Sequence, residues 1–190
     1  IKQIHPKKQQ SKLTMFQLNK YTDISEIPSY LVPCSQGTHV GLLSEAGCPG
    51  IADPGAEVVR IAHNENINVV PLVGPSSIIL AMMASGMNGQ NFTFNGYLPI
   101  DKKERKQALK SLEHLSFEKN QSQIFIETPY RNNSMLEDIC QSLSPNTEVC
   151  VACDITLPSQ FIKTATVGTW KKNMVDLHKR PTIFIIHKNQ

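Results

Sequence analysis

Residues 41–55 read GLLSEAGCPGIADPG, and this stretch indicates the fold class. An apolar run ends at Ser44, a loop of glycine, proline and acidic residues follows, and a helical pattern begins at Ala56. A second apolar run, residues 67–73, comes after that pattern. Nearly continuous apolar runs are typical of parallel strands that are buried on both faces. The order of strand, helix and strand therefore predicts a βαβ unit.

The alternation of strands and helices continues to the end of the chain and predicts an α/β fold throughout. After a helix between Pro75 and Gly86, the texture changes near Gly89, which predicts two domains, residues 1–89 and 90–190. In the second domain the periodicity predicts strands at 91–99, 123–127, 148–155 and 182–187, and a strand followed by a turn at 160–170. It also predicts helices at 101–115 and 131–143, and a short helix at 172–179.

Composition narrows the function classes. The chain has 190 residues and a formal net charge of +3, which permits a nucleic-acid partner without indicating one. No apolar run reaches the roughly 18 residues of a membrane helix, so we expect a soluble, cytoplasmic protein with no membrane partner. The five cysteines are an odd number, and Cys150 and Cys153 of the C-x-x-C motif would face opposite sides of a strand. We therefore expect reduced thiols and no metal site.

Two loops are candidates for a ligand site. Residues 44–55 follow the first expected strand, residues 73–77 follow the second, and both are rich in glycine and proline. In an open parallel sheet, ligands bind beyond the carboxyl ends of the strands, where loops and helix N-termini offer free main-chain groups. The chain has neither a G-x-G-x-x-G nor a P-loop motif. These loops read either as tight turns or as a backbone-lined site for a nucleotide-like ligand.

Four blocks of the chain together resemble the tetrapyrrole methylase superfamily. Within it they are most similar to the ribosomal RNA branch, small subunit methyltransferase I, whose blocks read approximately S-D-A-G-T-P-G-I-S-D-P-G, P-L-P-G-P-S-A, F-Y-E-S-P-H-R and R-E-L-T-K. The corresponding blocks here are SEAGCPGIADPGAEVVRIA (44–62), VVPLVGPSSIILAMMASG (69–86), IFIETPYRNNSMLEDI (124–139) and CDIT (153–156). They occur in the same order in the chain.

The resemblance implies a two-domain fold, with a parallel sheet and flanking helices in the N-terminal domain and a mixed sheet with helices in the C-terminal domain. It implies a homodimer that binds S-adenosylmethionine between the domains and methylates a cytidine ribose 2′-hydroxyl of 16S rRNA in the small ribosomal subunit. By motif, the cofactor-binding residues would be Glu45, Ala46, Gly47, Ser76, Ser77, Glu127, Thr128, Asp154, Ile155, Thr156, Pro181 and Thr182.

The departures from the family pattern point to alternatives. The family's opening strand with its A-T-P-I-G-N loop and the E-D-T-R block have no counterpart, so we expect part of the site to be absent from this sequence. Cys153 and Leu157 stand where the family has two cations. Two other readings stay open: a methyltransferase for a tetrapyrrole, and a non-catalytic homologue that binds the cofactor or RNA.

The chemistry of the reaction suggests catalytic residues. A ribose hydroxyl must lose its proton during attack, so a base must lie within hydrogen-bond reach. Glu127 is the first candidate, followed by Asp53 and Asp154. Arg131 is either a catalytic, anion-binding residue or part of a surface salt bridge. Tyr130 would either stack on a nucleotide base or pack within the protein. The four cations of residues 101–106 would either bind phosphates or form a solvated surface.

Overall fold

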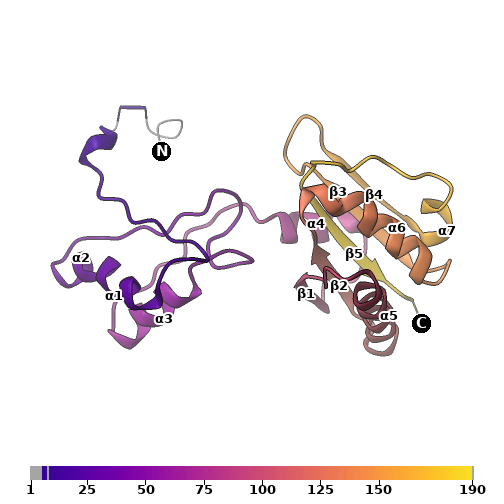
Figure 1. Ribbon diagram of the computed structural model, residues 1–190, viewed down its shortest axis with the longest axis horizontal. Helices are drawn as coiled ribbons and strands as arrows, with labels where there is room; N and C mark the ends of the chain where they lie inside the picture. Colours follow the sequence, from indigo (N-terminus) through magenta and orange to yellow (C-terminus); the bar gives the residue numbers. More distant parts are fainter. Residues whose placement is uncertain (1–5, 8, 190) are drawn as a thin grey trace. The chain divides into compact units, whose positions relative to one another are not determined.

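Strand β5, Thr182–His187, lies in the middle of a five-stranded sheet in a computed structural model that describes residues 6, 7 and 9–189 (Figure 1). The strand order is β1-β2-β5-β3-β4. β1 and β2 are parallel, whereas β5 is antiparallel to both of its neighbours, β2 and β3. The other strands are β1 Phe92–Tyr97, β2 Ser122–Ile126, β3 Glu148–Cys153 and β4 Phe161–Thr166. The α/β class and the mixed C-terminal sheet are confirmed.

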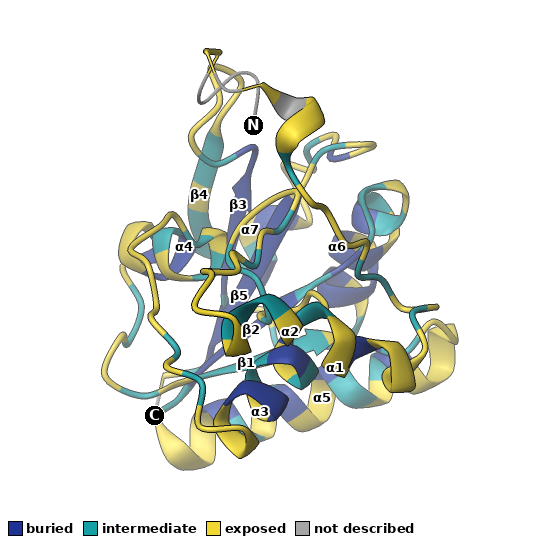
Figure 2. Ribbon diagram, turned by 90° about the vertical axis from the view of Figure 1, so that its left-hand side faces the viewer, coloured by how far each residue is buried: buried dark blue, intermediate teal, exposed yellow. Residues whose placement is uncertain are grey.

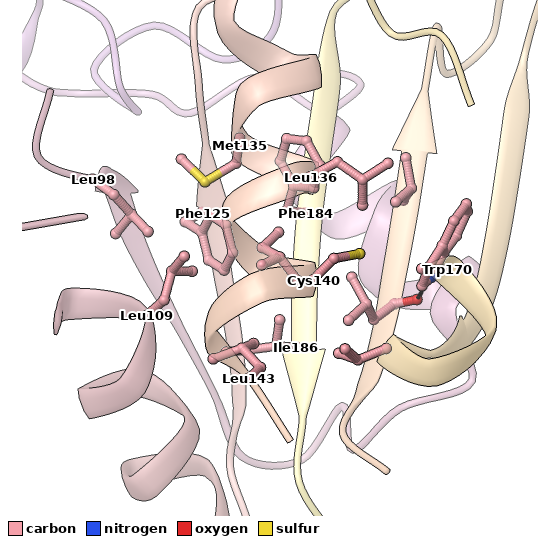
Figure 3. Close-up of a cluster of buried hydrophobic side chains, with 14 of the residues drawn as sticks. Leu98, Leu109, Phe125, Met135, Leu136, Cys140, Leu143, Trp170, Phe184 and Ile186 are labelled. Carbon is pink, nitrogen blue, oxygen red and sulfur yellow. Dashed lines mark hydrogen bonds between the residues drawn. The ribbon is translucent and has the colours of Figure 1, made fainter. Parts of the chain in front are cut away.

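Helices cover both faces of this sheet. Helices α5 (Lys102–Lys119), α6 (Asn132–Ser142) and α7 (Val167–Trp170) pack on one face, and α4 (Ser77–Ser85) packs on the other (Figure 1). On the first face, Phe125 and Phe184 stack with ring centroids 5.8 Å apart beneath Leu136 of α6 (Figure 3). Trp170 closes this core, and its Nε1 donates to the Val149 carbonyl at 3.0 Å.

The central strands are buried on both faces, as Figure 2 shows by colour. Successive side chains of a strand point to opposite faces. Cys153 accordingly lies in the cluster beneath α6, whereas Cys150 lies with Ala81 and Met82 of α4 in the opposite cluster. The expectation that the two thiols of the C-x-x-C motif face apart is confirmed.

The helix boundaries follow the sequence signals. Asp101 caps α5, because its Oδ1 accepts from the main-chain N–H groups of Lys103 and Glu104, both at 2.9 Å. Gly86 ends α4 in the left-handed region, at φ 73°, where glycine is favoured.

The described chain divides into two compact units after Gly74. This division lies before the expected boundary near Gly89, because α4 packs on β3, β4 and β5 and so joins the second unit. As a statement about folding domains, the division into 1–89 and 90–190 stays a prediction.

The first unit is built from short helices. Its core is formed by Ile27, Leu31, Val58, Ile61 and Ala62. Its elements are η1 Gln10–Lys12, η2 Ile24–Glu26, α1 Ile27–Tyr30, α2 Val32–Ser35 and α3 Ala56–Asn64. The helix expected after Gly55 is therefore present as α3.

The two strands expected in the first unit do not form. Residues 38–44 and 67–73 are irregular, and no strand occurs among the described residues before β1. Leu72 is 87% exposed and Leu43 is 71% exposed. Apolar composition favours a strand, but a strand also needs a neighbour that completes its hydrogen-bond ladder. The described residues of this unit supply no such neighbour, so the expected N-terminal parallel sheet is absent from them.

The prediction of a short helix at residues 172–179 is also wrong, because these residues form turns and irregular structure. Oδ1 of Asn133 accepts from the Leu177 N–H at 2.7 Å, and Oδ1 of Asp176 accepts from the His178 N–H at 3.0 Å. These side-chain acceptors replace the hydrogen bonds of a helix. Lys179 adopts φ 59°, which is incompatible with a continuing helix.

Candidate functional site

Three chain segments meet at one edge of the sheet. Ile126 pairs with Ile183, and Cys153 pairs with Thr182, so β2 and β3 end where β5 begins. We call this region the carboxyl edge; it comprises residues 127–131, 154–156 and 179–182. The structure thus brings together eight of the residues expected from the sequence, Glu127, Thr128, Arg131, Asp154, Ile155, Thr156, Pro181 and Thr182.

The two carboxylate oxygens of Glu127 differ, because one accepts hydrogen bonds and the other accepts none in the described chain. Glu127 follows β2 and is only 5% exposed. Its Oε1 accepts from the Thr128 N–H at 2.5 Å and from Nη2 of Arg131 at 2.6 Å. Arg131 ends the short helix η3, Pro129–Arg131, and the hydrogen bond to Glu127 raises its pKa above the ordinary value. Oε2 of Glu127 is buried and has no hydrogen-bond partner in the described chain.

Two more polar atoms beside Glu127 are buried without a partner among the described residues. They are Nε of Arg131 and Oδ1 of Asn132. The side chain of Asn132 is otherwise fixed, since its Nδ2 donates to the Arg180 carbonyl at 2.6 Å. A buried polar group without a partner costs about 1–3 kcal/mol and is uncommon in folded proteins. Three such atoms, on residues 127, 131 and 132, make this edge a candidate for binding a polar ligand. Asn132 is not among the residues that were predicted from the sequence.

Asp154 has a different role, because its carboxylate holds the loop after β3. It is 7% exposed and adopts φ 50°, a left-handed conformation that Asp and Asn tolerate. Its Oδ2 accepts from Nε of Arg180 at 2.8 Å and from Oγ of Ser159 at 2.9 Å. Burial raises its pKa, but the hydrogen bonds from Arg180 and Ser159 outweigh burial and bring the pKa below 3.8. Arg180, which the sequence analysis missed, could have been noticed as the cation directly before Pro181.

An aromatic and basic surface adjoins the carboxyl edge. Tyr130 is 69% exposed, and its ring lies edge-on to His178, with centroids 6.0 Å apart. Nζ of Lys179 lies 5.9 Å from the same ring centroid. The Lys179 N–H donates to the Pro129 carbonyl at 2.9 Å, which ties the two loops together. Tyr130 is thus an exposed ring that is available for stacking, whereas His178 and Lys179 were not singled out from the sequence.

The loop at residues 44–50 belongs to the first unit. Glu45, Ala46 and Gly47 are exposed, and Oγ of Ser44 donates to the Ala46 carbonyl at 2.8 Å. Gly47 has φ 76°. A side chain on Gly55, the last residue of the quoted stretch, would lie 2.8 Å from Leu42 and 3.2 Å from the Gly50 nitrogen. The glycines therefore allow a tight loop, while Asp53 is exposed.

Ser76 and Ser77 lie at the start of α4, in the second unit. Ser76 occupies the N-cap position without a capping side-chain hydrogen bond. The first main-chain N–H groups of a helix have no partner inside the helix. This helix start can therefore offer donors to a ligand.

No group of three or more His, Cys, Asp or Glu side chains that could hold a metal ion occurs among residues 6, 7 and 9–189. Over the same described residues, no helix is both long and apolar enough to cross a membrane.

Comparison with protein families gives a match over most of the chain. Residues 3–170 match the family described as Tetrapyrrole (Corrin/Porphyrin) Methylases. The chain is 33% identical over 181 residues to the ribosomal RNA small subunit methyltransferase I of Escherichia coli O157:H7. This alignment covers 93% of this chain and 62% of that protein. The chain is also 32% identical over 154 residues to the protein of the same name from Vibrio cholerae. That alignment covers 80% of this chain and 52% of the relative. The chain thus spans less than two thirds of the length of these relatives.

Two solved structures share the fold. The methyltransferase CobJ superposes on this chain with a TM-score of 0.62 at 18% sequence identity. The superposition covers 95% of this chain and 77% of the CobJ chain. The cobalamin biosynthetic enzyme cobalt precorrin-4 methyltransferase, CbiF, gives a TM-score of 0.54 at 14% identity, with 88% and 72% covered.

Proposed function

We propose, from the premise that this chain belongs to the tetrapyrrole (corrin/porphyrin) methylase family, that it is an S-adenosylmethionine-dependent methyltransferase. The observation that carries this proposal is the buried Oε2 of Glu127 at the carboxyl edge, which has no hydrogen-bond partner in the described chain, together with the unpartnered atoms of Arg131 and Asn132. Such a cluster suits a small polar ligand better than it suits packing.

The residues of the carboxyl edge fit the nucleoside part of this cofactor. Adenosine carries an amino group and ribose hydroxyls that donate hydrogen bonds, and Oδ1 of Asn132 is a buried acceptor without a partner in the described chain. We propose that Thr128, residues 154–156, Pro181 and Thr182 add contacts around it. By resemblance, residues 45–47 and the two serines at the start of α4 would also contact the cofactor.

We propose that the acceptor is the 2′-hydroxyl of a cytidine ribose in 16S rRNA. The relatives from Escherichia coli and Vibrio cholerae are named as methyltransferases of small-subunit ribosomal RNA, and this supports an RNA acceptor. The bound cofactor supplies a methyl group that is activated by a sulfonium centre. As the methyl group moves from the sulfonium sulfur to the ribose oxygen, S-adenosylhomocysteine is left, and Oε2 of Glu127 can accept the proton that the hydroxyl loses.

Arg131 and Arg180 would supply positive charge at this edge. Cys153, at the position of one family cation, is fully buried under α6, and Leu157 replaces the other cation. Arg180 lies beside Asp154, and its side chain is 31% exposed. We propose that Arg131 and Arg180 contact phosphate groups of the RNA, and that Tyr130 stacks on a base. A substrate in the small ribosomal subunit also implies a cytoplasmic protein, and the family resemblance implies a homodimer.

Two measurements on the chain test this proposal. Calorimetry with S-adenosylmethionine and S-adenosylhomocysteine tests cofactor binding. Transfer of a radiolabelled methyl group is measured with unmodified small ribosomal subunits, with free 16S rRNA and with a porphyrinogen. Binding together with transfer to RNA ribose is the expected result. Transfer to the porphyrinogen alone would establish a tetrapyrrole acceptor instead. Cofactor binding without any transfer would contradict catalysis by this chain and favour a binding protein.

A further inference from the structure

The first half of α5 presents a dense positive surface. Lys102, Lys106 and Lys110 are spaced four residues apart, which places them on one side of the helix, and Lys103 lies beside them. With Asp101 and Gln107, these four lysines line a shallow hollow on the surface. We call the four residues the lysine stripe. Residues 101–110 contain five cations and two acids, a net charge of +3 that equals the formal net charge of the whole chain.

The lysine stripe lies on a rigid support. On the inner side of α5, Leu109 is fully buried. Nη1 of Arg105 donates to the Ile100 carbonyl at 2.7 Å, and Nη2 pairs with Oδ2 of Asp138 on α6 at 2.5 Å. A charged surface on a fixed helix loses less entropy on binding than one on a mobile loop.

The local acids do not neutralise this surface. Nζ of Lys102 and of Lys106 lie 3.8 Å and 3.7 Å from Oδ1 of Asp138, but the same carboxylate already pairs with Arg105. Three cations therefore share one acid. Lys103 and Lys110 form no ion pair within the described part of the chain. The stripe thus carries excess positive charge.

The stripe begins close to the carboxyl edge. β1 runs parallel to β2, and Tyr97 pairs with Ile126, so β1 ends at the same edge as Glu127. Helix α5 starts five residues after Tyr97 and contacts β2 and β5. With a rise of about 1.5 Å per residue, the stripe extends about 12 Å from Lys102 to Lys110. An extended polyanion with repeated charges fits this length better than a single small anion does.

We propose that the lysine stripe binds the sugar–phosphate backbone of RNA that flanks the nucleotide held at the carboxyl edge. This inference rests on the proposed function, because it assigns the RNA substrate a path along α5. Cations that neutralise phosphates release counterions, so their contribution is recognised by its dependence on salt.

The test compares two double variants that lose the same charge. Lys103→Gln with Lys110→Gln alters the stripe, and both changes leave the contacts of Asp138 intact. Lys119→Gln with Lys172→Gln is the matched control, since both residues are exposed and lie outside the stripe. The affinity for a fluorescent single-stranded RNA is measured by anisotropy over a range of salt concentrations. We expect about a tenfold loss for the stripe variant, with a salt slope smaller by about 1.4, at 0.7 per lost phosphate contact, and little change for the control.

Equal losses in both double variants would overturn the proposal, because net charge alone would explain them. Unchanged RNA affinity in the stripe variant would overturn it as well. So would a loss of affinity for uroporphyrin without a loss for RNA, since that result would assign the stripe to a small polycarboxylate. A selective loss of RNA affinity supports the stripe even if the unaltered protein transfers no methyl group to RNA, a result that would contradict only the proposed function.

Discussion

Arg105 of α5 and Asp138 of α6 form an ion pair, in which Nε and Nη2 of Arg105 lie 2.9 Å and 2.5 Å from Oδ2 of Asp138. The two side chains are only 7% and 2% exposed. The pair thus fixes the angle of the helix that carries the lysine stripe and begins beside the carboxyl edge. Removing one partner leaves the other charge buried without compensation.

Replacement of Asp138 by leucine is expected to destabilise the second unit by about 3–5 kcal/mol, because Arg105 would stay charged and unpaired. Trp170, the single tryptophan, is buried in this unit, so its fluorescence during urea unfolding reports the loss. The double variant Arg105→Met with Asp138→Leu should recover most of the stability. A single variant as stable as the unaltered protein would contradict the importance of the pair.

Replacement of Glu127 by glutamine is expected to lower the rate of methyl transfer by about 10²–10⁴-fold, because an amide cannot accept the proton that the hydroxyl loses. Glutamine keeps an oxygen that accepts hydrogen bonds, so cofactor affinity should change by much less. Single-turnover rates and calorimetry separate the two effects. Glu137→Gln, an exposed position on α6, is the control. A Glu127→Gln variant that transfers methyl groups at the normal rate would exclude Glu127 as the base.

Replacement of Tyr130 by alanine is expected to weaken RNA binding by about 1–3 kcal/mol, the usual contribution of one stacked base. Phenylalanine keeps the ring and should keep the affinity. Tyr21 is a matched control, because it is 82% exposed and Nζ of Lys20 lies 4.9 Å from its ring centroid. The RNA affinities of Tyr130→Ala, Tyr130→Phe and Tyr21→Ala are compared. Equal losses of affinity for Tyr130→Ala and Tyr21→Ala would count against stacking at Tyr130.

The charge of Asp154 is expected to stabilise the fold in a pH-dependent way. Since its pKa is lower in the folded protein than the ordinary 3.8, its stabilisation is present above that value and is lost as the pH falls through the folded pKa. Asp154→Asn keeps the left-handed backbone favourable and removes only the charge. We expect the variant to lose about 1–3 kcal/mol at pH 7 and less at pH 2, as measured by urea unfolding. Equal losses at both pH values would show that the charge is irrelevant.

The stability of the fold is also expected to depend on His187, in a range of higher pH. It is 4% exposed, and Oγ of Ser122 lies 3.2 Å from its Nδ1. Burial lowers its pKa below 6.5, while the charge of Glu148 acts in the opposite direction. The stabilisation by the neutral ring is therefore complete above pH 6.5 and is lost as the pH falls through the folded pKa. We expect His187→Gln to flatten the change in stability between pH 8 and pH 5, whereas His114→Gln, at an exposed position, should leave that slope unchanged.

Features that depend on local patterns could be predicted from the amino-acid sequence alone. The strands of the second unit, the capping of α5 by Asp101 and the opposite orientations of Cys150 and Cys153 follow from periodicity and from side-chain chemistry near in the chain. The residues expected at positions 127–128, 154–156 and 181–182 also meet at one edge, because strand ends are local features that recur along the chain.

Which of these elements find partners depends on contacts between residues that are distant in the chain. Residues 38–44 and 67–73 are as apolar as a buried strand, yet in the described chain they lack the neighbour that a hydrogen-bond ladder requires. The pairing of Arg180 with Asp154, and of Arg105 with Asp138, joins residues 26 and 33 positions apart. Strand ladders and buried ion pairs depend on groups that are distant in the chain, so local residue pattern could not reveal them.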